Sequence, residues 1–125
     1  MYLMALSAEA GSCRCQSGDS VWELDDAGVK QRIADFASRP RLVTWSATAE
    51  RDMASIPGMT KAGVLEALLE HLACGYVVHA DYMRNGDLAY IFNCFVGRRR
   101  RYIKLKFWGV AGQERMYVFS AHPNR

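Results

Sequence analysis

The sequence contains no long hydrophobic run. Arg, Lys, Asp or Glu interrupts every apolar stretch before it reaches the roughly 20 residues that a membrane-spanning helix needs. Residues 1–10 also lack the basic leader and the long apolar core of a secretory signal, and Glu9 interrupts them. We therefore expect a cytoplasmic protein with no membrane partner.

The chain has only four cysteines, Cys13, Cys15, Cys74 and Cys94. They are too few and too unevenly spaced for an extracellular disulfide framework, so we expect reduced thiols. Structural zinc sites usually show two close ligand pairs, and here Cys13 and Cys15 form the single close cysteine pair, while His71 precedes Cys74 by three residues. Walker A, GxGxxG and GxSxG motifs are absent as well. The sequence thus predicts no metal and no cofactor.

Acidic residues are scarce in the second half of the chain. Residues 1–75 hold 7 Lys and Arg against 10 Asp and Glu, whereas residues 76–125 hold 9 against 3. The second half therefore carries a net charge of +6, although the whole chain carries only +3. Such an excess attracts polyanions and favours nucleic acid as a partner.

Periodicity divides the chain into three parts. Its 125 residues, 50% of them hydrophobic and 23% charged, suit one compact domain. Residues 1–24 have little periodicity and predict an arm or irregular segment, residues 25–75 have helical periodicity, and residues 76–125 have the periodicity of strands. The sequence predicts an α+β fold in which N-terminal helices pack on a C-terminal antiparallel sheet of about four strands.

Three helices are expected in residues 25–75. Asp25 or Asp26 can cap the first, Ser46 the second and Thr60 the third, because these side chains accept hydrogen bonds from free amides at a helix N-terminus. The expected strands are residues 76–82, 88–96, 102–108 and 115–120. Between the first two strands, Asn85-Gly86 predicts a tight hairpin turn in which both residues have positive φ.

Alternation along the last two strands sorts their side chains onto two faces. The third strand has an apolar face, Ile103, Leu105 and Phe107, and a solvated positive face, Tyr102, Lys104 and Lys106. On the fourth, Met116, Val118, Ser120 and His122 are expected to share one face, opposite Tyr117 and Phe119. A hairpin between these strands brings His122 close to Tyr102 and to the arginine run Arg98–Arg101.

A tyrosine, a histidine and several cations at one sheet edge suit the cleavage of an RNA phosphodiester. The 2′-hydroxyl loses a proton, the phosphorane gains charge and the leaving 5′-oxygen is protonated, and this reaction needs no metal. Simpler interpretations stay open. Arg98–Arg101 can be a solvated turn, Tyr102 a packing residue at the start of a strand, and His79 and His122 merely exposed side chains.

Five segments together carry a resemblance to a known protein family. In chain order they are Leu42–Ala49, Gly58–Thr60, Val64–Leu68, Tyr102–Lys106 and Val118–His122. This order, over about residues 41–122, resembles the MqsR family of toxins. The family comprises ribosome-independent mRNA interferases of bacterial type II toxin–antitoxin systems, with a RelE-like fold of helices against an antiparallel sheet. The most specific segments are the Tyr-x-Lys-Leu strand and the closing Val-x-Ser-x-His strand.

The resemblance implies roles for individual residues. Tyr102 matches a tyrosine of the family's proposed active site, and His122 matches the basic residue that ends the closing strand. This sequence has His79 in the region of a further family lysine, and it has no match near Ala89 for a family glutamine. We expect His122 to be the general acid, Tyr102 to orient the scissile phosphate and His79 to be the base. Lys104 is expected to bind a neighbouring phosphate.

The expected function is that of a metal-independent endoribonuclease toxin, which cleaves single-stranded mRNA and is neutralised by a cognate antitoxin protein. The other cations are expected to bind RNA: Arg98, Arg99, Arg100, Arg101, Lys106 and Arg115. Two other functions fit the same residues. One is a non-catalytic module with a RelE-like scaffold that binds nucleic acid or protein, and the other is an enzyme for a different phosphorylated substrate.

Overall fold

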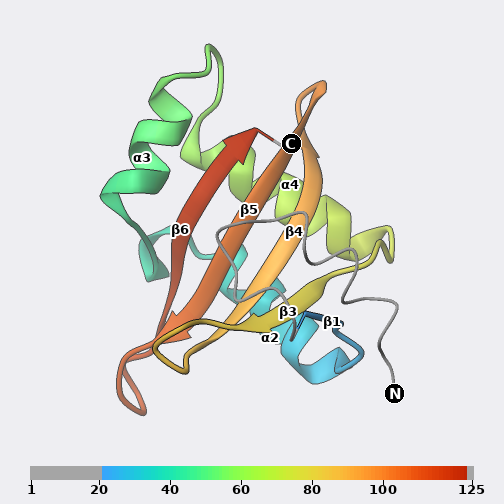
Figure 1. The fold of residues 1–125 in the computed structure, drawn as a ribbon, viewed down its shortest axis with the longest axis vertical. Coiled ribbons are helices and arrows are strands. Elements are labelled where there is room, and N and C mark those ends of the chain that lie inside the picture. The colour runs from blue at the N-terminus through green and yellow to red at the C-terminus, as the bar shows by residue number, and fades with distance from the viewer. Residues whose placement is uncertain (1–20, 124–125) are drawn as a thin grey trace.

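A computed structural model describes residues 21–123, which form three α-helices and one six-stranded mixed sheet (Figure 1). Of the arm predicted over residues 1–24, residues 1–20 with Cys13 and Cys15 lie outside the described residues, whereas Trp22–Glu23 form a short strand of the sheet. The helices are α2 (Ala27–Ala37), α3 (Ala47–Ala54) and α4 (Lys61–Ala73), and a 3₁₀ turn covers Pro40–Leu42. The strands are β1 (Trp22–Glu23), β2 (Val43–Trp45), β3 (His79–Tyr82), β4 (Leu88–Val96), β5 (Arg99–Trp108) and β6 (Arg115–Pro123).

The sheet has the strand order β1-β3-β4-β5-β6-β2. Neighbouring strands are antiparallel except β2 and β6, which run parallel. The predicted α+β class and the antiparallel run from β3 to β6 are confirmed. The prediction of about four strands is wrong, because the short strands β1 and β2 add one strand at each edge. These two strands also alternate with the helices, so the helices do not all precede the sheet.

Side-chain caps begin all three helices of the described region. Asp26, Ser46 and Thr60 each accept hydrogen bonds from backbone amides of the first helical turn, at 2.8 to 3.2 Å. These caps satisfy amides that no carbonyl within the helix can reach. Gly75, at a φ of 74°, follows the end of α4. No helix within residues 21–123 is long and apolar enough to cross a membrane.

The core lies between the sheet and helices α2 and α4, which lie behind the strands in Figure 1. Ile33 of α2, Leu68 of α4, Phe92 of β4 and Ile103 of β5 are all fully buried. Each such side chain stabilises the fold by roughly 1.5–3 kcal/mol relative to an exposed position. We call this face of the sheet the helix side and the opposite face the outer side.

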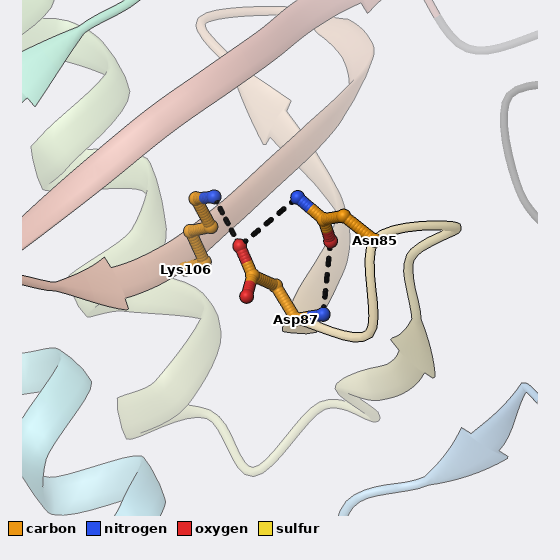
Figure 2. A network of polar contacts seen from close by, with 3 residues as sticks. All are labelled: Asn85, Asp87 and Lys106. Atoms are coloured by element: carbon orange, nitrogen blue, oxygen red, sulfur yellow. Dashed lines mark hydrogen bonds and ion pairs between the residues drawn. The ribbon is translucent and has the colours of Figure 1, made fainter.

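The turn between β3 and β4 differs from the prediction. Gly86 has a φ of 91°, but no residue other than glycine has a positive φ within residues 21–123, so Asn85 does not have one. The Met83 amide donates to the Asp87 carbonyl at 2.7 Å, so the loop between these residues is longer than a two-residue hairpin turn. In this loop only Gly86 has a positive φ. Asn85 Oδ1 accepts from the Asp87 amide at 2.9 Å, and Lys106 donates to the Asp87 carboxylate (Figure 2).

A β-bulge in β6 overturns the predicted alternation of that strand. Leu105 of β5 pairs with Val118 and Lys104 pairs with Ser120, which leaves Phe119 as an extra residue. After this residue the side chains change faces, so the helix side receives Met116, Val118 and Ala121, all fully buried. Ser120 and His122 instead lie on the outer side.

Candidate functional site

Tyr102 and His122 lie side by side on the outer side of the sheet. They are direct partners in the β5–β6 register, their ring centroids are 4.7 Å apart and their ring planes differ by 7°. Tyr102 is 7% exposed, and His122 is half-buried. The predicted proximity of these two residues is confirmed, and it depends on the bulge at Phe119 and on the extension of β6 to Pro123.

The His122 ring is oriented by its own strand. Its Nδ1 lies 2.9 Å from the carbonyl oxygen of Pro123. Because a carbonyl oxygen only accepts, Nδ1 carries the hydrogen and donates it. Nε2 is therefore the ring nitrogen that can take up and release a proton, which is the capacity that a general acid or base requires.

Two lysines follow Tyr102 on the same face of β5. Lys104 is 2% exposed, and its ammonium nitrogen lies 5.7 Å from the centre of the Phe119 ring. The prediction that this face is solvated is therefore wrong at Tyr102 and Lys104. β5 is a central strand of the sheet, and Lys104 lies between Ile91 of β4 and Ser120 of β6 in the register.

Lys106 is already engaged within the protein. Its ammonium lies 2.6 Å from Oδ2 of Asp87, which Asn85 also contacts (Figure 2). The hydrogen bond and the charge of Lys106 hold the pKa of the Asp87 carboxyl below its ordinary value. A phosphate at Lys106 would have to compete with this carboxylate.

His79 lies on the outer side, on β3. It pairs with Ile91 of β4, and Ile91 in turn pairs with Lys104 of β5. Adjacent strands lie about 4.8 Å apart, so about 14 Å separates the backbone of His79 from that of β6. The sheet thus places Tyr102, Lys104 and His122 together, with His79 toward the opposite edge of the same face.

The arginine run is divided between the two sides of the sheet. Arg98 lies in the turn, whereas Arg99, Arg100 and Arg101 belong to β5, which begins earlier than predicted. Arg100 lies on the outer side, with its guanidinium 5.2 Å from the centre of the Phe95 ring. Arg101 pairs with the core residue Cys94, so its side chain lies on the helix side, where it is 4% exposed.

Arg115 lies at the other end of the sheet. It pairs with Trp108 at the end of β5, and its guanidinium donates to the carbonyl oxygen of Arg41 at 2.9 Å. Seven residues separate Arg101 from Trp108 along β5, or roughly 23 Å at the rise of a strand. Arg115 and the arginine run therefore do not form one patch.

A cavity of about 1060 Å³ lies along α4 and the β4–β5 hairpin. Its walls include residues that the sequence analysis did not single out, among them Glu66, Glu70 and Asn93. Asn93 pairs with Tyr102 across β4 and β5. The turn at Gly97-Arg98 could have revealed this pairing, because a short turn fixes the register of its hairpin.

The side chain of His71 has a structural role. It is 6% exposed, its Nε2 donates to the Val77 carbonyl at 2.7 Å, and its ring meets Phe92 edge-on.

The two cysteines of the described residues differ in their surroundings. Cys74 is exposed, and burial raises the pKa of the Cys94 thiol to about 12. Across residues 21–123, no three His, Cys, Asp or Glu side chains gather in a group that could hold a metal ion.

Comparisons of the chain with protein-family models, with curated proteins and with solved structures found no match. The arguments for function therefore rest on the geometry of this face and on the sequence.

Proposed function

We propose that this protein is the toxin of a bacterial type II toxin–antitoxin system, a cytoplasmic endoribonuclease that cleaves single-stranded mRNA without a metal ion. The observation that carries the proposal is the Tyr102–His122 pair, stacked at 4.7 Å on a face that also holds Lys104. An oriented imidazole, a phenol and an ammonium group suit RNA transesterification. The resemblance of residues 41–122 to the MqsR family supports the same function.

In the proposed reaction, the RNA 2′-oxygen attacks the adjacent phosphorus, and the bond from phosphorus to the 5′-oxygen breaks. His79 takes the proton of the 2′-hydroxyl, and Nε2 of protonated His122 gives a proton to the leaving 5′-oxygen. Tyr102 orients the phosphate, and the charge of Lys104 stabilises the phosphorane. The products are a 2′,3′-cyclic phosphate and a 5′-hydroxyl end.

The mechanism requires His79 and His122 to act on one phosphodiester from strands whose backbones lie about 14 Å apart. Both side chains must therefore extend toward the centre of the outer side. A His79→Ala variant tests this step, with an expected fall in cleavage of about 10²–10⁴-fold for the loss of a general base. Unchanged cleavage would assign the base to another group.

A non-catalytic module that binds RNA or protein is the second candidate function. The burial of Tyr102 and Lys104, at 7% and 2% exposure, favours it because a phosphate has little direct access to these side chains. If the protein is the ribonuclease toxin, a cognate antitoxin protein would act by covering or restraining the basic surface.

The deciding experiment incubates the purified protein with a long single-stranded RNA in EDTA and maps the product ends, with His122→Ala in parallel. Cleavage by the wild type alone, with cyclic-phosphate ends, supports the ribonuclease. Intact RNA, with binding that weakens steeply as salt rises, would favour the binding module. Equal cleavage by His122→Ala would refute the role of His122.

A further inference from the structure

Arg101 is a buried cation with incomplete hydrogen bonding. Its Nη1 donates to the Arg100 carbonyl at 3.0 Å, but its buried Nε has no hydrogen-bond partner among residues 21–123. The ion pairs of this part of the chain are Arg32–Glu114, Lys61–Glu50 and Lys106–Asp87, so none compensates Arg101. A buried donor without an acceptor costs free energy, and an anion bound beside Arg101 would supply the missing acceptor.

The cavity along α4 provides the space for such an anion. Arg101 lines it, and so does Arg99, which lies on the same side of β5 two residues earlier. Burial, together with the charge of Arg99, lowers the pKa of Arg101. Gly63, in the first turn of α4, also lines the cavity, so the positive end of the helix dipole adds to the two guanidinium charges.

The remaining walls of the cavity suit a nucleobase. Glu66 and Glu70 of α4 present hydrogen-bond acceptors, and Met59 and Val96 present apolar surface. Single-stranded RNA is recognised by such a combination, because its unstacked bases expose both hydrogen-bonding edges and flat faces. The two carboxylates repel a phosphate and the guanidinium groups attract it, so a phosphate is expected to bind at the arginines.

The cavity also reaches the outer side of the sheet, because His79 and Asn93 line it. The opening between the two sides lies at the edge of β4 that faces β3. Strand β3 pairs with β4 only as far as Ile91, and beyond Ile91 no strand of the described chain covers this edge. Asn93 pairs with Tyr102. The cavity therefore reaches the register partner of Tyr102 on the outer side of the sheet and Arg101 on the helix side.

We propose that this cavity binds one nucleotide of the RNA next to the cleaved bond, and that Arg101 and Arg99 hold its phosphate. The identity of the ligand as RNA rests on the proposed function. The phosphate site at Arg101 rests on the geometry of the cavity.

The test compares the wild type with Arg101→Met and with Arg84→Met, a matched control that removes the same charge from an exposed position in the β3–β4 loop, outside the residues that line the cavity. Thermal unfolding is followed with each of the four nucleoside 5′-monophosphates and with the corresponding nucleosides. At least one monophosphate should raise the unfolding midpoint of the wild type and of Arg84→Met, because a ligand that binds the folded state stabilises it. Arg101→Met should show no rise, and nucleosides should act more weakly on every protein.

Two further measurements make the result decisive. Without ligand, Arg101→Met should unfold at a midpoint no lower than that of the wild type, since it removes an uncompensated buried charge. If Arg101→Met does not fold, Arg101→Lys takes its place, and its affinity for the monophosphate should fall about tenfold or more because the Nε donor is lost. An equal rise of the unfolding midpoint in all proteins, or no rise in any of them, would overturn the site. The site would also be overturned if glutamate raised the midpoint and the monophosphates did not.

RNA cleavage in EDTA by the same proteins separates this inference from the proposed function. Cleavage without any Arg101-dependent rise in the midpoint overturns the nucleotide site and leaves the ribonuclease standing. An Arg101-dependent rise without cleavage overturns the ribonuclease and leaves the phosphate site standing. If both hold, Arg101→Met should cleave with a KM raised about tenfold or more, while Arg84→Met changes KM less.

Discussion

Replacing His122 by two different residues separates its chemistry from its packing. The imidazole stacks on Tyr102 at 4.7 Å with nearly parallel planes, and such a pair contributes about 0.5–1.5 kcal/mol beyond the burial of its area. His122→Ala removes the ring and its stacking. His122→Phe keeps a flat ring against Tyr102 but has no nitrogen to carry a proton.

The expected losses differ in size and in kind. A positioned general acid contributes about 10²–10⁴-fold in rate, or about 3–5.5 kcal/mol of transition-state stabilisation. Both variants should therefore lose about 10²–10⁴-fold in kcat/KM for RNA cleavage. Only His122→Ala should also lose about 1 kcal/mol of the free energy of unfolding, because His122→Phe retains the stacked pair.

RNA cleavage in EDTA and urea denaturation of the three proteins measure the two quantities separately. Cleavage by His122→Phe within tenfold of the wild type would refute His122 as the general acid. A His122→Phe variant that unfolds as easily as His122→Ala would refute the assignment of the stability loss to ring stacking.

Two turns give the remaining predictions. Gly109→Ala places a Cβ 2.6 Å from the Gln113 carbonyl oxygen at a φ of 109°, whereas Gly112→Ala, at a φ of 86°, meets no atom within 4 Å. In urea denaturation the first should therefore lose about 1–3 kcal/mol more than the second, and equal losses would contradict the clash. Asp87→Asn removes a carboxyl whose pKa Lys106 lowers in the folded state, so the wild type should be the more stable protein at pH above the ordinary value of 3.8. That difference should disappear in acid denaturation as pH falls through the lower folded-state pKa, and a constant difference would contradict this linkage.

Local chemistry accounts for the elements that the sequence predicted well. The caps at Asp26, Ser46 and Thr60 act within one helical turn, so the residues that define each helix start are all close in sequence. Strand β4 matches its predicted bounds, 88–96, for a similar reason, because turn residues lie directly before and after it. These local signals sufficed for the α+β class and for the antiparallel order of β3 to β6.

Long-range pairing determined what the sequence did not reveal about the sheet. β1 and β2 contain only 2 and 3 residues, and each exists as a strand because a distant partner, β3 or β6, pairs with it. Neither has enough residues for a recognisable alternation.

The sequence by itself determined which chemical groups this chain carries and the positive charge of its second half, and its hairpin pattern predicted that His122 lies near Tyr102. The tertiary structure decided which side of the sheet each group faces. One extra residue at Phe119 moves Ser120 and His122 to the outer side, and the pairing of Arg101 with Cys94 buries that arginine beside the core. Both outcomes follow from the two-residue period of a strand, in which a shift of one residue reverses the facing of every side chain beyond it.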